Sequence, residues 1–150
     1  MTMTKYKSQC PELKVELKRD QIKKAKIANS QNSADFFREI WDDSIGIYES
    51  FFVIYLNASN TTIGWYKVSQ GGLQGTVADP RLIVKKALDV LATSFIMCHN
   101  HPSGNLTPSE ADKVITKKIK EGAGFLDIKL LDHIILTEES YYSFADEGQL

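Results

Sequence analysis

The chain has 150 residues, of which 43% are hydrophobic and 25% charged, which is typical of one globular domain and excludes a disordered or fibrous chain. Its formal net charge of −1 provides no overall attraction for a polyanion. Its apolar runs are far too short to span a bilayer, and its first residues lack the apolar stretch of a signal peptide. The cysteines, Cys10 and Cys98, are too far apart for a metal or redox motif. We therefore expect a cytoplasmic, soluble protein with no membrane contact.

The N-terminal segment is the basic part of the chain. Residues 1–26 contain eight lysines and arginines but three acidic residues, a local balance of +5 against −6 for the rest. Within this segment Leu13, Val15 and Leu17 alternate with polar residues, as in a short strand. We predict a basic extension over residues 1–28, followed by a single domain over 29–150. A solvated lysine-rich face is the favoured interpretation of the extension, with contact to nucleic acid as the alternative.

The first half of the domain is predicted to form a helix followed by a hairpin. Ser33 suits the N-cap of a helix over 34–43, whose apolar residues recur at helical spacing. Residues 50–56 are rich in β-branched and aromatic side chains, residues 57–60 have turn chemistry, and residues 61–68 again favour a strand. The helical apolar residues are Phe36, Phe37, Ile40 and Trp41.

A second helix and a central strand follow a glycine-rich loop at residues 71–75. Asp79 and Pro80 are a favourable N-cap and first helical residue. Residues 94–98 form an apolar run too short for a helix, which predicts a central strand. The face of the second helix expected to be buried consists of Ile83, Ala87, Leu88 and Leu91.

The last part of the chain is predicted to add a third helix and two closing strands. Thr107 and Glu110 match a capping box that opens a helix ending near Gly122. Its expected buried stripe consists of Ala111, Val114, Ile115 and Ile119. Residues 128–131 and 134–136 indicate two strands, and residues 141–148 a packed terminal turn. Strands that alternate with helices predict an α/β fold: a single-domain α/β/α sandwich around one mixed sheet.

The residues with the clearest chemistry are two histidines and an aspartate. His99 and His101 stand two apart at the end of the predicted central strand, so both imidazoles can face one cation. Asp112 lies early in the next helix, where its side chain leans back toward the strand end. Two histidines and one carboxylate leave a fourth position open, as in catalytic zinc sites. His99, His101 and Asp112 are therefore the predicted ligands of one Zn²⁺ per chain.

Two nearby residues receive other interpretations. Cys98 points to the opposite face of the strand from His99, which makes a nucleophilic Cys–His pair unfavourable and predicts a small core residue. His133 stands within an apolar stretch, where a buried, hydrogen-bonded histidine is favoured over a metal ligand. A base-deaminase site is excluded because the chain lacks the required later Cys-x-x-Cys pair.

The spacing of these residues resembles the JAMM motif of MPN-domain metalloproteases. The pattern is His99-x-His101, seven further residues, Ser109, two further residues and Asp112. The wider sequence resembles the RadC-like branch of that family, the group labelled DNA repair protein RadC with a JAB domain. The resemblance covers roughly residues 30–150 and is strongest at residues 49–57, 79–81, 99–104, 107–112, 130–133 and 141–146.

The resemblance implies a JAB/MPN fold of cytidine-deaminase-like architecture and a zinc-dependent metallopeptidase activity. It assigns Glu49 as the general base that takes a proton from a zinc-activated water, and Ser109 as the donor that stabilises the oxyanion. The implied substrate is a peptide or isopeptide of unknown identity. The alternative is a non-catalytic metal-binding interaction module, associated with DNA-repair or DNA-processing partners. The sequence leaves the oligomeric state open.

Overall fold

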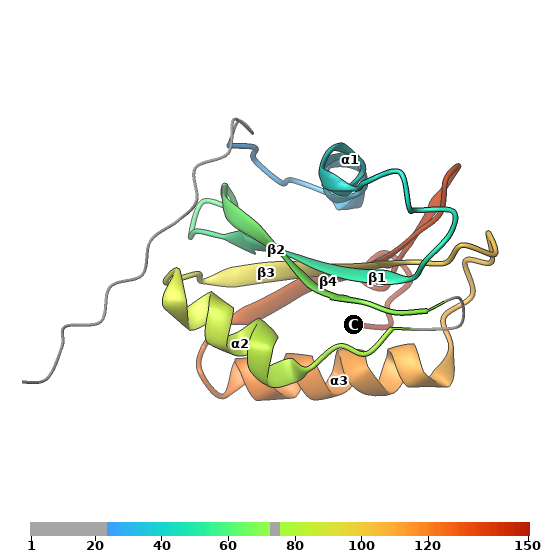
Figure 1. Ribbon diagram of the computed structural model, residues 1–150. Coiled ribbons are helices and arrows are strands. Elements are labelled where there is room, and N and C mark those ends of the chain that lie inside the picture. The colour runs from blue at the N-terminus through green and yellow to red at the C-terminus, as the bar shows by residue number, and fades with distance from the viewer. Residues whose placement is uncertain (1–23, 73–75) are drawn as a thin grey trace, which may run out of the picture.

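The computed structural model describes residues 24–72 and 76–150 (Figure 1). These residues form a five-stranded mixed sheet with strand order β2-β1-β3-β4-β5, flanked by three helices. Helix α1 covers one face of the sheet, and α2 and α3 cover the other (Figure 1). The elements are α1 (Ser30–Ile40), β1 (Ser50–Leu56), β2 (Thr62–Gln70), α2 (Pro80–Asp89), β3 (Ser94–Asn100), α3 (Glu110–Gly124), β4 (Lys129–Leu136) and β5 (Tyr141–Ser143). The predicted α/β sandwich is confirmed.

The sheet topology places the end of β3 next to the start of α3. Strands β1 and β2 form the predicted antiparallel hairpin, and β1 also pairs antiparallel with β3. Strand β4 pairs parallel with β3 and antiparallel with β5. Parallel neighbours require a crossover, which α3 provides. The C-terminal end of β3, in the middle of the sheet, therefore leads into the segment where α3 begins.

Two hydrophobic clusters make up the core, one on each face of the sheet. Every residue of β1 and of β3 is buried, as expected for strands covered on both sides. Phe51, Met97 and Ile119 belong to the cluster under α2 and α3, whereas Phe37 and Cys98 belong to the cluster under α1. None of the helices in the described ranges is long and apolar enough to cross a membrane. The predicted strand at Leu13–Leu17 lies outside the described residues.

Helix α1 begins earlier than predicted. Asn29 is its N-cap, with the side-chain oxygen accepting a hydrogen bond from the backbone of Asn32 at 2.8 Å. Ser33, the predicted N-cap, is buried inside the helix, and its hydroxyl donates to the carbonyl oxygen of Asn29. The prediction was wrong because Asn and Ser cap helices about equally well, and the earlier one allows Ser33 and Phe36 to pack against the sheet.

Helix α2 has the predicted start, with Asp79 as N-cap and Pro80 as the first helical residue. Its buried face is narrower than expected, since Leu88 is 48% exposed and Leu91 is 85% exposed. The helix ends at Asp89, and Leu91 adopts a positive φ of 54°, so its side chain leaves the helical face. Ile83 and Ala87 are the α2 residues that reach the core.

Helix α3 is capped by Ser109 rather than by Thr107. Ala111 and Val114 of the predicted buried stripe are exposed, and the side that faces the sheet contains Thr116, Ile119 and Ala123. The spacing of apolar residues did not predict which face of α3 is buried, because a polar residue, Thr116, faces the sheet and has hydrogen-bond partners there.

Strand β4 is one strand where two were predicted. It pairs with β3 from Lys129 onward, but the register skips Leu131 between the partners of Phe95 and Ile96. An extra residue in a strand is a β-bulge, which reverses the alternation of side chains beyond it. This bulge turns His133 toward the α3 face, in register with Met97. Residues 141–148, predicted as a turn, begin with the short strand β5.

Candidate metal centre

His99 is held near the end of β3. Its side chain is only 4% exposed and stacks on the ring of Phe51 with the two ring planes 2° apart. Strand β1 pairs with β3 on one side and β4 on the other, so the backbone of His99 is fixed on both sides. The histidine therefore has little freedom to rotate away from the end of the sheet.

His101 follows β3 by one residue and is held by a turn. Its backbone N–H donates to Leu136, and its carbonyl accepts from Gly104, whose φ of 80° favours glycine. Its ring Nδ1 lies 2.5 Å from the carbonyl oxygen of Asn105. A carbonyl oxygen accepts only, so Nδ1 of His101 must carry a hydrogen and Nε2 is the ring nitrogen that can bind a cation.

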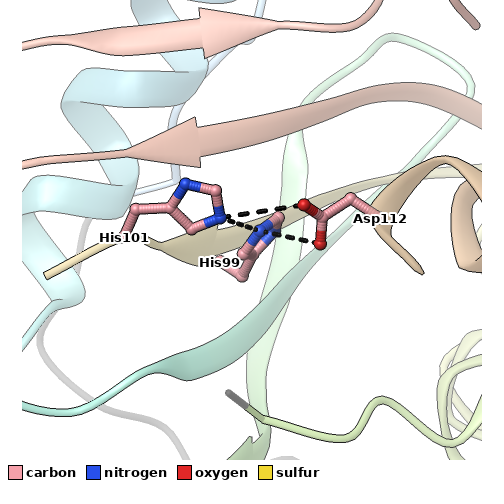
Figure 2. Close-up of side chains that lie close together, drawn as sticks. All are labelled: His99, His101 and Asp112. Carbon is pink, nitrogen blue, oxygen red and sulfur yellow. Dashed lines mark hydrogen bonds and ion pairs between the residues drawn. The ribbon is translucent and has the colours of Figure 1, made fainter. Parts of the chain in front are cut away.

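Asp112 reaches the two histidines from the first turn of α3. Its Oδ1 lies 3.2 Å from Nε2 of His99, and its Oδ2 lies 3.7 Å from Nε2 of His101 (Figure 2). The same Oδ2 accepts hydrogen bonds from the hydroxyl and the backbone N–H of Ser109, both at 2.7 Å. The capping box thus fixes the carboxylate in the direction of the histidines.

The surroundings of Asp112 favour its charged form. Burial alone raises the pKa of a carboxyl group, but the hydrogen bond and positive charge that His99 can provide, together with the two donors of Ser109, outweigh it. The pKa of Asp112 is therefore well below its usual range. The carboxylate remains an anion that only accepts hydrogen bonds and can bind a cation.

Ligand atoms of His99, His101 and Asp112 all lie within 4.8 Å of one another. The two Nε2 atoms are 3.0 Å apart. Nε2 of His101 and an anionic carboxylate thus converge at one point, and a divalent cation is the species that two imidazoles and one carboxylate together suit. These three residues could hold a metal ion.

Glu49 lies beside this cluster in a pocket of about 210 Å³. The pocket is also lined by Phe51, Ile115, His99 and Asp112. Glu49 immediately precedes β1 and is half-buried. The structure therefore places the predicted general base in the same pocket as two of the predicted metal ligands, while its role stays a prediction. A larger pocket of about 580 Å³ lies along α3 and contains none of these residues.

Ser109 is hydrogen-bonded to Asp112 at the start of α3. Its hydroxyl donates to Asp112 and also accepts from the backbone N–H of Asp112 at 3.1 Å. In this geometry Ser109 caps α3 and orients Asp112, a predicted metal ligand. Its role as an oxyanion donor stays a prediction.

The expectations for Cys98 and His133 are confirmed. Cys98 is fully buried on the α1 side of the sheet, away from His99. His133 is fully buried and hydrogen-bonded, lying 2.8 Å from His99 and 2.6 Å from Thr116. Burial and the neighbouring His99 lower the pKa of His133 well below its usual range. His133 is therefore neutral.

Sequence reasoning missed two polar residues that support the site. Asn100 is fully buried and hydrogen-bonds the backbone next to Glu49, and Thr116 hydrogen-bonds His133. The only signal at Asn100 is a polar residue within a buried strand, which calls for hydrogen-bond partners but does not identify them.

Comparison with known proteins gives a family match and several relatives. A family model described as RadC-like JAB domain matches residues 27–149. A UPF0758 protein of Flavobacterium johnsoniae is 48% identical over 129 residues, which are 86% of this chain and 56% of that protein. The UPF0758 protein YfjY of Escherichia coli is 41% identical over 102 residues, 68% of this chain and 64% of that protein. A UPF0758 protein of Aquifex aeolicus is 36% identical over 124 residues, 83% of this chain and 52% of that protein. The chain thus spans between 52% and 64% of the length of these relatives.

Proposed function

The chain belongs to the RadC-like JAB domain family, and from this premise we propose that it is a zinc-dependent hydrolase of peptide or isopeptide bonds. His99, His101 and Asp112 would hold the zinc ion, and Glu49 would act as general base. The observation that supports this proposal best is the convergence of two imidazoles and a carboxylate beside Glu49 in one pocket.

The donor set suits a catalytic rather than a structural ion. Three protein ligands leave one coordination position open for water or substrate, whereas structural zinc sites use four protein ligands. A zinc ion bound here would make a water molecule more acidic and polarise the substrate carbonyl. The side chains of His99 and Asp112 are only 4% and 16% exposed, so the surrounding protein restricts their geometry.

Glu49 and Ser109 would move and stabilise charge around the scissile bond. Glu49 would accept a proton from the attacking water and return it to the leaving amine. Ser109 holds Asp112 with both its hydroxyl and its backbone N–H. The hydroxyl could therefore turn to a developing oxyanion while the N–H still orients the carboxylate.

Metal content provides the first test. We expect about one zinc per chain by plasma mass spectrometry, lost in Asp112→Ala and in His101→Ala. Asp35→Ala is the matched control, because Asp35 is an exposed aspartate on α1. Zinc content that is unchanged in the two ligand variants, or absent from the wild type after reconstitution, would rule out the proposed ligands.

Hydrolysis provides the second test. Zinc-loaded protein is incubated with mixed peptides and with isopeptide-linked conjugates, and the products are read by mass spectrometry. Glu49→Gln should keep its zinc but cleave nothing that the wild type cleaves. A wild type that binds zinc but cleaves neither class of bond would favour the non-catalytic interaction module. Contact of residues 1–26 with nucleic acid is a separate prediction, which filter binding across a salt series tests.

A further inference from the structure

A row of buried hydrogen bonds starts at Nδ1 of His99, the ring nitrogen that does not face the Asp112 carboxylate. Nδ1 of His99 is 2.8 Å from Nε2 of His133, and Nδ1 of His133 is 2.6 Å from Oγ1 of Thr116. Oγ1 of Thr116 is in turn 2.5 Å from the carbonyl oxygen of Asp112. His133 is 0% exposed and Thr116 is 2% exposed, so water does not compete for these bonds.

The direction of every bond in this row follows from its last member. The carbonyl oxygen of Asp112 can only accept, so the single hydroxyl hydrogen of Thr116 must point to it. Oγ1 of Thr116 must then accept, which requires the hydrogen on Nδ1 of His133. The neutral His133 therefore has a free lone pair on Nε2, which accepts a hydrogen from Nδ1 of His99.

The row therefore keeps a hydrogen on Nδ1 of His99, and Nε2 is the ring nitrogen directed at the candidate metal site. That nitrogen faces Oδ1 of Asp112 at 3.2 Å and Nε2 of His101 at 3.0 Å. We propose that His133 and Thr116 are positioning residues that hold a hydrogen on Nδ1 of His99 and so orient the ring with Nε2 toward the metal ion. This proposal rests on the proposed metal site. It adds two residues that touch neither the ion nor the substrate.

The fold makes this row possible through two features already described. The bulge at Leu131 turns His133 toward the α3 face, where it can reach His99. The inward register of α3 places Thr116 one turn after Asp112, so the same turn supplies a metal ligand and the carbonyl that orients the row. Partners of this kind typically change metal affinity by roughly 10- to 100-fold when they are removed.

Nuclear magnetic resonance of the metal-free protein tests for this hydrogen directly. The chain contains only three histidines, so long-range proton–nitrogen correlation spectra of the imidazole rings are simple to assign. We expect Nδ1 of His99 to carry a hydrogen that it donates to Nε2 of His133. A His99 ring without a hydrogen on Nδ1 in the folded, metal-free protein would overturn the proposal, whether or not the protein hydrolyses peptides.

Zinc affinity of variants provides the second test. His133→Leu removes both hydrogen-bonding atoms, whereas His133→Gln keeps one acceptor and one donor. We expect roughly 10- to 100-fold weaker zinc binding for His133→Leu, a smaller loss for Thr116→Val and substantial rescue in His133→Gln. Ile134→Ala is the control, because Ile134 is equally buried on β4 but packs on the α1 side. It should lower stability without weakening zinc binding.

The outcomes separate this proposal from the proposed function. A wild type that binds no zinc contradicts the metal site, while the resonance experiment still reports the hydrogen on Nδ1 of His99. A folded His133→Leu variant that binds zinc as tightly as the wild type contradicts the positioning role of His133 and Thr116 but leaves the metal site intact. If His133→Leu does not fold, Thr116→Val decides: unchanged zinc affinity and an unchanged hydrogen on Nδ1 of His99 in that variant would overturn the proposal.

Discussion

The side-chain oxygen of Asn100 accepts a hydrogen bond from the backbone N–H of Ser50 at 2.7 Å. The amide nitrogen of the same side chain donates to the carbonyl oxygens of Tyr48 and Ile45, at 2.9 Å and 2.6 Å. Asn100 therefore holds the backbone on both sides of Glu49. Because Asn100 also stands between His99 and His101, one residue of β3 links the position of the proposed base to that of the proposed ligands.

We expect Asn100→Ala to destabilise the protein by about 3 kcal/mol, because it leaves a buried N–H and two carbonyl groups without a partner. Urea denaturation followed by circular dichroism measures this loss. Asn57→Ala is the matched control: Asn57 also accepts from two backbone N–H groups, but it is exposed, and water can replace its bonds. A control loss as large as that of Asn100→Ala would show that burial is not the cause.

The start of α3 provides a second prediction. Ser109→Ala removes the N-cap hydroxyl and should lower stability by about 1 kcal/mol. It should also weaken zinc binding, because Asp112 loses one of the two donors that orient it. Thermal denaturation and zinc titration measure the two effects.

Thr107→Ala is the control for this prediction, since Thr107 was the cap expected from the sequence and is exposed ahead of the helix. It should change neither property. If Thr107→Ala destabilised the protein more than Ser109→Ala, the helix start seen in the structure would be wrong.

Much of the site was predictable because its chemistry is local in the sequence. A strand end with His99 and His101, a turn, and Asp112 in the first turn of a helix suffice to bring three side chains together. The start of α2 was also predictable from local sequence, because Asp79 is directly followed by a proline that favours the first helical position. The start of α3 was not, because Thr107 and Ser109 have similar capping chemistry two residues apart.

The supporting residues could not be predicted because they depend on tertiary contacts. Thr116 faces inward because α3 packs with this residue against His133. His133 reaches His99 because of the bulge in β4, and the only trace of that bulge in the sequence is the spacing of the apolar residues in β4. Local pattern assigns polar residues to the surface. A buried polar network overrides that pattern wherever each member finds a partner.

Cys98 provides a third prediction. It is fully buried, and burial raises the pKa of its thiol well above the usual value, so the reactive thiolate is scarce in the folded protein. We expect Cys98 to resist iodoacetamide in native buffer and to react readily in urea, as read by mass spectrometry of the peptide that contains residue 98. Rapid labelling of the native protein at this residue would contradict its buried position.

The acid response of Asp112 is the last prediction. Since folding lowers the pKa of Asp112 below the ordinary value of 3.8, its charged form contributes stability that is fully present above that value and is lost as the pH falls below it. Asp112→Asn lacks this contribution. In metal-free buffer, where no bound ion adds to stability, the variant should therefore be less stable than the wild type at pH 6.

The difference between the two proteins should then shrink as the pH is lowered through about 4 toward 3, since protonation removes the charge that the substitution also removes. Urea denaturation at a series of pH values measures it. Asp35→Asn is the control, because Asp35 is exposed on α1, where it accepts a hydrogen bond from Gln31, and it is not one of the candidate metal ligands. A difference for Asp112→Asn that stayed constant down to pH 3 would mean that its carboxylate is not stabilised in its charged form by His99 and Ser109.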